Sequence, residues 1–410
     1  MSLPIVAQAA FIEDSKASLE LRNFYMNRDF RHDTATQSKR EEWAQGFLLR
    51  YESGFTEGTV GVGIDAYGFT GLKLNSGRGT SNTGILPTGR SDKRAPSSYG
   101  ELGAAAKFRI SETTLRAGTL MPNLPVVSAA DARMLPQTFQ GVQLTSLDIN
   151  NLTLNVGQLG RDNQRNSTNN EPMKIETSAD KRDKSKYSKT NQDLSNKFNF
   201  LSGSYKWNDQ LTTGYHYGHL DDVYKQHIVN GVFTLPIADG QSLKADLRYA
   251  KSSEDGNSGI DNKAISGMLT YSLGYNSFGL GYQKMSGDTG YTYLLLTSPY
   301  LVNVSTVRNT FDSTDEKSWQ ARYDYNFAGL GVPGLNLMVR YTSGSNIYLG
   351  ANESRGKEWG RDTDISYVFQ KGPLKNLGVK WRNSTLRSDV KGFGEIDENR
   401  LIVSYTIPLL

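Results

Sequence analysis

Basic side chains recur at every second position in many segments of this 410-residue chain. If these segments are strands, alternate side chains point to the same face. One face then carries the following bases: Arg22, Arg50, Lys107, Arg109, Arg116, Lys244, Arg248, Arg322, Arg340, Lys380, Arg382 and Arg400. The same rule places fewer acids there, namely Glu20, Glu52, Asp246, Asp324 and Asp364. A guanidinium is a planar fork that matches a carboxylate, so the pattern predicts a row of weak sites along which small carboxylates move. The alternative for each single base is a structural ion pair with a neighbouring acid.

Motifs for catalysis and for metal binding are missing from the sequence. It has no Cys, no GxxxxGK[ST] motif and no GxGxxG motif. On a strand, His216 and His219 face opposite sides, and a meeting of His219 with His227 across a short hairpin is more typical of a polar contact than of a metal site. We therefore expect no enzyme activity, no cofactor, no metal and no nucleic-acid partner. A barrel lipase and a surface adhesion protein are the alternatives to a channel.

The elements that carry these residues alternate between apolar and polar positions. Residues 319–327 place Trp319, Tyr323 and Phe327 on one face and polar residues on the other, and residues 335–342, 377–384 and 400–407 repeat the pattern. Such alternation is typical of a sheet with lipid on one side and water on the other. We expect Trp319, Tyr323, Tyr341, Trp381 and Tyr405 to face lipid. A soluble antiparallel sandwich would alternate in the same way.

Composition and connection lengths favour the barrel. Only 37% of the residues are hydrophobic, although the chain has 22 Tyr and 16 Phe, and no run of about 18 apolar residues could form a transmembrane helix. The connections between strands are alternately short and long, except near 221–224, as in barrels of the bacterial outer membrane. The sequence thus predicts an all-β fold: a single antiparallel transmembrane β-barrel of about 18 strands, with both chain ends at the end of the short turns.

One long connection differs from the others. Residues 119–141 are apolar and contain three of the twelve Pro, which cannot donate to a strand ladder. An apolar loop needs a buried place, and a wide barrel offers its lumen. We expect this loop to fold inward and to narrow the pore near Asp131 and Arg133, with Leu124, Val126 and Val127 as apolar contacts there. The alternative is a loop packed on its outer neighbours.

The start of the chain is expected to lie outside the fold. Met1-Ser2-Leu3 is typical of a vector-derived start, and Ala7-Gln8-Ala9 resembles the end of a signal-peptide cleavage site. We therefore divide the chain into residues 1–10, a vector-derived start with a possible remnant of an export signal, and residues 11–410, the transmembrane barrel. The alternative for the first residues is a plain disordered start.

Several long motifs carry a resemblance to a known family. They are LRNFYMNRDF (21–30), ESGFTEGTVGVGIDAYG (52–68), LNSGRGTSN (74–82), MLPQTFQG (134–141), KSWQARYDYNFAGLGVPGLNLMVRY (317–341) and GKEWGRD (356–362). From about Phe11 to Leu410 the chain resembles the OprD family of outer-membrane porins. LNSGRGTSN and GKEWGRD are similar to the branch that takes up aromatic and other monocyclic carboxylates, which includes BenF-like porins.

The resemblance implies an 18-stranded barrel, two outer loops folded into the lumen, and a ladder of Arg and Lys along one wall. It places loop residues Arg133 and Asp288 at the constriction, and wall bases at Arg22, Arg322, Arg340, Lys380 and Arg382. The chain departs from the family pattern at Gln158, where relatives often carry a base, and at its last residue, Leu410. Gln158 leaves the charge of the constriction open.

These observations predict a channel for passive uptake of small carboxylates, above all aromatic monocarboxylates such as benzoate. We expect its substrate-binding residues to be Arg22, Lys107, Arg109, Arg116, Arg133, Asp288, Arg322, Arg340, Lys380 and Arg382. We expect the barrel to contact outer-membrane lipid and lipopolysaccharide, as a monomer or a weak trimer. The alternative function is a porin for basic amino acids or a general small-solute porin.

Overall fold

The computed structural model describes residues 11–31, 37–88, 94–176, 181, 194–307, 310–390 and 394–410. Residues 1–10, for which a vector-derived start and an export-signal remnant are predicted, lie outside the described residues. In the described part of the chain, no helix is long and apolar enough to cross a membrane.

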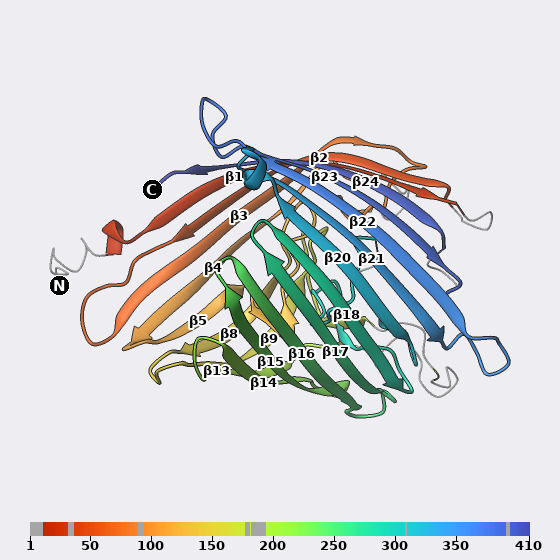
Figure 1. The fold of residues 1–410 in the computed structure, drawn as a ribbon. Helices are drawn as coiled ribbons and strands as arrows, with labels where there is room; N and C mark the ends of the chain where they lie inside the picture. The colour runs from red at the N-terminus through yellow and green to blue at the C-terminus, as the bar shows by residue number, and fades with distance from the viewer. Residues whose placement is uncertain are drawn as a thin grey trace.

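Eighteen long strands form the barrel wall in the described ranges (Figure 1). They are β1 (Lys16–Phe30), β2 (Lys39–Glu52), β3 (Gly61–Ser76), β4 (Ser98–Ile110), β5 (Thr113–Leu120), β8 (Thr138–Ser146), β9 (Leu152–Asn163), β13 (Phe198–Lys206), β14 (Leu211–Leu220), β15 (Tyr224–Ala238), β16 (Gln241–Glu254), β17 (Asp261–Leu273), β18 (Asn276–Gly287), β20 (Lys317–Asn326), β21 (Leu335–Ile347), β22 (Gly356–Val368), β23 (Gly378–Ser388) and β24 (Ile396–Pro408). The smaller elements are β6 (Asn123–Leu124), β7 (Val127–Ser128), β10 (Asn170–Glu171), β11 (Met173–Glu176), β12 (Leu194–Ser195), β19 (Tyr293–Leu294) and the 3₁₀ helix η1 (Phe327–Leu330).

The wall is antiparallel throughout and closes on itself, because β1 pairs with both β2 and β24. Side chains alternate across it as the sequence predicts. In β1, Phe24 and Met26 are buried, whereas Trp319 of β20 and Trp381 of β23 are 49% and 41% exposed on the outside. Trp319 also contacts Tyr341 of the neighbouring strand. The predicted single barrel is therefore confirmed, and the sandwich is excluded.

The two ends of the barrel differ. At the turn end, short connections such as 239–240 and 274–275 use Gly240 and Gly274 in the left-handed region, with φ of 68° and 55°. The first residues of β1 pair with the last of β24, Ser18 opposite Pro408, so both described chain ends lie at the turn end, as predicted. The other end, the loop end, carries the long connections and one short exception at 221–223.

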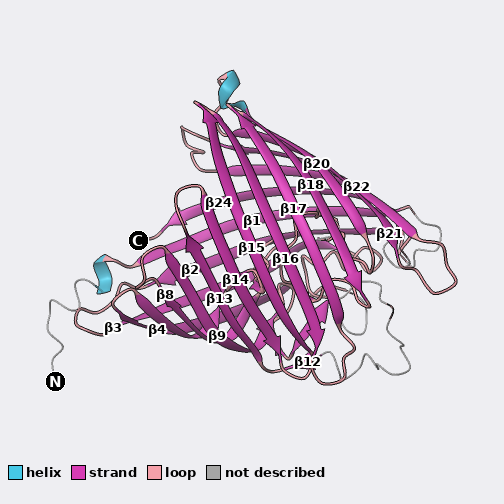
Figure 2. Ribbon diagram, turned by 60° about the horizontal axis from the view of Figure 1, so that its bottom comes forward, coloured by secondary structure: helices cyan, strands magenta, loops and turns pink. Residues whose placement is uncertain are grey.

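Two connections from the loop end enter the lumen, as their contacts with the inner wall show. Figure 2 draws loops behind the front strands of the barrel. The first, residues 121–137, reaches from β1 and β2, where Met134 lies against Gly46, to β14, where Val126 lies against Gly218. We name it the first inner loop. The second, residues 288–307 and 310–316, touches β16 through Leu301 and β24 through Thr306. We name it the second inner loop. Both expected inward loops are thus present, and the alternative of a loop packed on the outside is excluded.

The inner loops share two apolar clusters with the barrel wall. Val126 and Val127 of the first inner loop are at most 3% exposed and pack in one cluster with Leu159 and Phe198 of the wall. The expectation that Val126 and Val127 provide apolar contacts at the narrow point is therefore wrong. Their apolar surface holds the loop against the wall, because burying it there removes it from water.

Candidate functional site

The site is a passage made of three cavities in series. The loop-side cavity has a volume of about 500 Å³, the middle cavity about 380 Å³ and the turn-side cavity about 360 Å³. Arg133 of the first inner loop lines both the loop-side and the middle cavity. Ser366 and Lys380 line both the middle and the turn-side cavity. Arg133 therefore marks the narrow point between the first two cavities.

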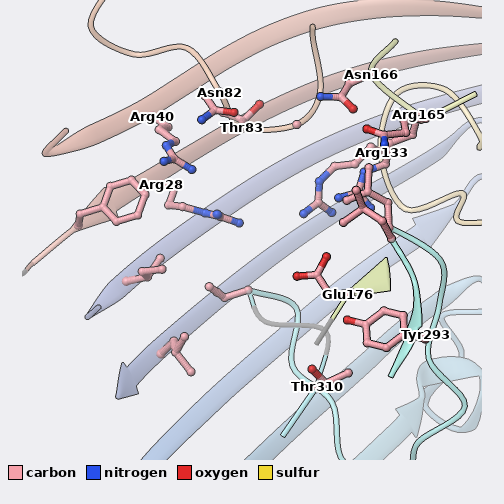
Figure 3. Close-up of a pocket in the computed structure, with 18 residues that line it drawn as sticks. Arg28, Arg40, Asn82, Thr83, Arg133, Arg165, Asn166, Glu176, Tyr293 and Thr310 are labelled. Carbon is pink, nitrogen blue, oxygen red and sulfur yellow. The ribbon is translucent and has the colours of Figure 1, made fainter. Parts of the chain in front are cut away.

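Four arginines surround the loop-side cavity, as Figure 3 shows: Arg28, Arg40, Arg133 and Arg165. Arg28 is paired with Glu398, at 2.5 Å. The other three form no ion pair in the described ranges, and Arg40 donates only to the amide oxygen of Gln37. Unpaired guanidinium groups beside open space are suited to bind an anion, because their donors remain available.

The backbone of Arg133 is fixed by a contact with Arg22. Its carbonyl oxygen accepts a hydrogen bond from Nη1 of Arg22, at 2.8 Å, and the same nitrogen contacts Oδ1 of Asp131, at 2.6 Å. The guanidinium of Arg133 donates to the carbonyl of Ala132, and its Nε has no partner. Arg22 thus fixes the loop, while the Arg133 side chain, 5% exposed, lines both cavities without a carboxylate partner in the described ranges.

The structure brings four of the predicted bases together on the middle cavity: Arg22, Arg133, Lys380 and Arg382. Lys380 forms no ion pair in the described part of the chain. Arg382 is paired with Asp364, at 2.6 Å, and still lines the cavity. These four residues form the part of the predicted ladder that reaches the passage.

The other bases predicted to bind substrate lie in the wall, with partners of their own, and line none of the three cavities. Arg340 is buried against Asp362 at 2.7 Å, and Arg322 is paired with Asp324 at 2.7 Å. Lys107 and Arg116 share Asp65, and Arg109 lies over the ring of Phe55. For these residues the structure fits the alternative of a structural contact.

Two further expectations change with the structure. Asp288 is exposed at the loop end, where its carbonyl accepts from the Lys181 backbone, and it lines none of the three cavities. The geometry therefore does not bring it to Arg133. Gln158 shares the outward face of β9 with Val156 and donates to Asn199, at 2.6 Å. It cannot alter the charge of the lumen.

Sequence reasoning missed Arg28, Arg40 and Arg165. Arg28 has the same parity as Arg22 in β1, and Arg40 that of Arg50 in β2, so longer predicted strands would have found them. Arg165 follows an irregularity in the pairing of β8 with β9 and then leaves the strand, so no local pattern indicates its direction.

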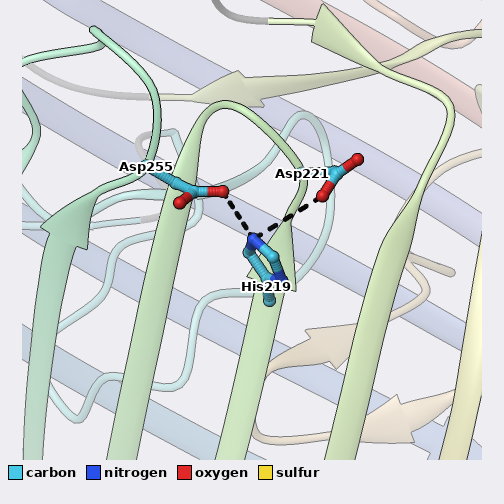
Figure 4. Close-up of side chains that lie close together, drawn as sticks. All are labelled: His219, Asp221 and Asp255. Atoms are coloured by element: carbon cyan, nitrogen blue, oxygen red, sulfur yellow. Dashed lines mark hydrogen bonds and ion pairs between the residues drawn. The ribbon is translucent and has the colours of Figure 1, made fainter.

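A His and two Asp gather outside the passage, at the loop end (Figure 4). Nε2 of His219 lies 2.6 Å from Asp255 and 3.9 Å from Asp221. Each carboxylate also has a lysine partner: Lys225 at 2.6 Å for Asp255, and Lys197 at 3.7 Å for Asp221. Hydrogen bonds from Lys225 and His219 hold the pKa of Asp255 at about 2. The cluster is therefore explained as an ion-pair network that ties together neighbouring connections.

Comparisons with known proteins agree with this geometry. The family model described as outer membrane porin, OprD family, matches residues 9–409. A porin-like protein GalP from Pseudomonas putida is 39% identical over 414 residues, covering 100% of this chain and 96% of the relative. The crystal structure of OpdQ from Pseudomonas aeruginosa is 55% identical with a TM-score of 0.88, covering 98% of this chain and 100% of that one. A BenF-like porin from Pseudomonas fluorescens is 42% identical with a TM-score of 0.90, covering 97% and 100%.

Proposed function

The chain belongs to the OprD family of outer-membrane porins, and on this premise we propose that it is a selective channel for small carboxylates, with aromatic monocarboxylates such as benzoate as preferred substrates. It is a channel protein of the bacterial outer membrane and not an enzyme. In such barrels the short turns face the periplasm and the long loops face the outside. A solute taken up therefore passes from the loop-side cavity to the turn-side cavity.

The observation that carries the proposal is the change of charge along the passage. Four arginines and one glutamate line the loop-side cavity. Four bases and two acids line the middle cavity, and one lysine and two aspartates line the turn-side cavity. An anion therefore meets strong attraction where it enters and little attraction where it leaves, which is what conduction requires.

The two ends of a carboxylate substrate need different contacts. A carboxylate that leaves water needs new hydrogen-bond donors, and the unpaired guanidinium groups of Arg133 and Arg165 supply them. Phe30 and Tyr293 line the same cavity and offer apolar surface for an aromatic ring. Both features together favour an aromatic monocarboxylate over a basic amino acid, which the arginines would repel.

Uptake into proteoliposomes tests the proposal with radiolabelled benzoate, a linear dicarboxylate and arginine. We expect benzoate to enter fastest and arginine slowest. Arg382→Ala is expected to slow benzoate uptake, because Arg382 lines the middle cavity. Arg116→Ala serves as a matched control in the wall, since Arg116 lines none of the three cavities and its partner Asp65 keeps its ion pair with Lys107. Faster entry of arginine than of benzoate would contradict the proposal and would favour the basic amino-acid porin.

A further inference from the structure

We propose that Lys251, Lys263, Lys284 and Lys317, on the outer surface of the barrel, bind the phosphate groups of a phosphorylated lipid of the outer leaflet. They lie on the neighbouring strands β16, β17, β18 and β20, which Figure 1 shows side by side in the wall. The site is separate from the passage and does not depend on the transported solute.

The direction of each lysine follows from its strand neighbours. All four lysines are exposed. The residues beside them are buried on the lumen side: Ser252, Asn262 and Gln283 are 0% exposed, and Ser318 is 1% exposed. Because alternate side chains on a strand point to opposite faces, the lysines point away from the lumen.

The four lysines form a continuous row. Lys251 is directly opposite Lys263, and Lys284 is directly opposite Lys317. Lys263 and Lys284 are diagonal neighbours, since Lys284 pairs with Ile265. Like charges directly opposite each other destabilise a strand pair. Two such pairs in one row therefore call for a negative charge from outside the wall.

The wall itself does not supply that charge. None of the four ammonium groups forms an ion pair in the described ranges, and the outward-facing Asp261, two residues from Lys263, does not form one with it. The loop end of β1, β2, β23 and β24 is different. There Lys39 is paired with Glu41, and Arg387 with Asp397 at 3.1 Å. The four lysines differ from these bases, because their ammonium groups have no carboxylate partner in the described part of the wall.

The four lysines lie at the level along the strands where the headgroups of the outer leaflet are expected. Two residues toward the periplasm, Tyr249, Tyr282 and Trp319 are 40%, 52% and 49% exposed on the same outer face. Aromatic side chains of this kind mark the boundary between hydrocarbon and headgroups. Lysines just beyond them reach the headgroup phosphates, where each base adds to the binding of anionic lipid.

The test compares two variants with the same loss of charge. One carries Lys251→Gln, Lys263→Gln, Lys284→Gln and Lys317→Gln. The control carries Lys16→Gln, Lys206→Gln, Lys371→Gln and Lys375→Gln, which removes four exposed lysines from the periplasmic end. Binding of fluorescent lipopolysaccharide to the detergent-purified barrels is measured, with dephosphorylated lipopolysaccharide and inorganic phosphate as competitors.

We expect the first variant to bind lipopolysaccharide at least about tenfold more weakly, and the control to bind as the wild type does. Dephosphorylated lipid and inorganic phosphate should compete poorly, and a variant with four Lys→Arg changes should retain binding. An equal loss of lipopolysaccharide binding in both variants would overturn the proposal. Strong competition by dephosphorylated lipopolysaccharide or by inorganic phosphate would overturn it as well. Single-channel conductance should stay unchanged in both variants, which shows that the barrels are folded and keeps this test separate from that of the channel.

Discussion

At the scale of single residues, Arg133 has the largest expected effect on transport. It lines two of the three cavities and has no carboxylate partner in the described part of the chain. Hydrogen bonds to charged groups contribute about 1.5–3 kcal/mol. Arg133→Ala should therefore slow benzoate uptake by about tenfold and should raise the conductance for small ions, because the narrow point widens. Uptake and planar-bilayer conductance measure the two effects.

The control for this prediction is Arg109→Ala, which removes the same charge at the periplasmic mouth, beside Phe55. It should leave benzoate uptake near the wild-type rate. Equal effects of the two substitutions would mean that the net charge of the lumen, and not the position of Arg133, sets the rate.

Asp255 is expected to make the stability of the barrel depend on pH. Its folded-state pKa is about 2, because Lys225 and His219 donate hydrogen bonds to it, whereas an unperturbed Asp has a pKa of about 3.9. A carboxylate with a lowered pKa stabilises the folded state above its unfolded pKa, and this contribution is lost as the pH falls toward 2. Wild-type protein should therefore unfold at a higher temperature than Asp255→Asn at pH 6, with a smaller difference at pH 2. The exposed neighbour Asp222, changed to Asn, should show a much smaller difference at either pH.

At the scale of elements, the first inner loop sets the width of the pore. Arg22 binds the carbonyl of Arg133 and the carboxylate of Asp131, and Val126 packs against β14 across the lumen. Deletion of residues 124–132 should increase single-channel conductance in a planar bilayer, because the obstruction is removed while the wall strands remain paired. Deletion of residues 351–354, which are exposed in the connection between β21 and β22, is the control and should change little. Unchanged conductance in the first deletion would mean that another segment forms the constriction.

At the scale of the whole molecule, the lumen charge should make the pore prefer anions. The bases gather at the loop-side and middle cavities, which remain open to water, so salt screens them. The Debye length falls from about 10 Å at 0.1 M salt to about 3 Å at 1 M. The anion-to-cation permeability ratio, measured from reversal potentials, should therefore exceed one at low salt and fall toward one as the salt rises. A ratio that does not change with salt would indicate selection by pore size alone.

The alternation of residue types was enough to determine the barrel and the face of most wall side chains. This is because side-chain direction in a strand is a local property with a period of two. Trp319 and Trp381 outside, and Arg22 and Arg382 inside, follow directly from it. The inward path of residues 121–137 was also predictable, since an apolar, Pro-rich loop needs a buried place.

Only the tertiary structure decided which bases are available to a solute. Arg340 meets Asp362, and Lys107 meets Asp65, through the pairing of strands and the reach of long side chains. Such contacts depend on the register of the closed barrel, which no single strand contains. The positions of Arg165 and Gln158 also could not be predicted from a single strand. An irregularity in the pairing of β8 with β9 and the path of the chain beyond β9 bring Arg165 to the passage, while Gln158 remains outside.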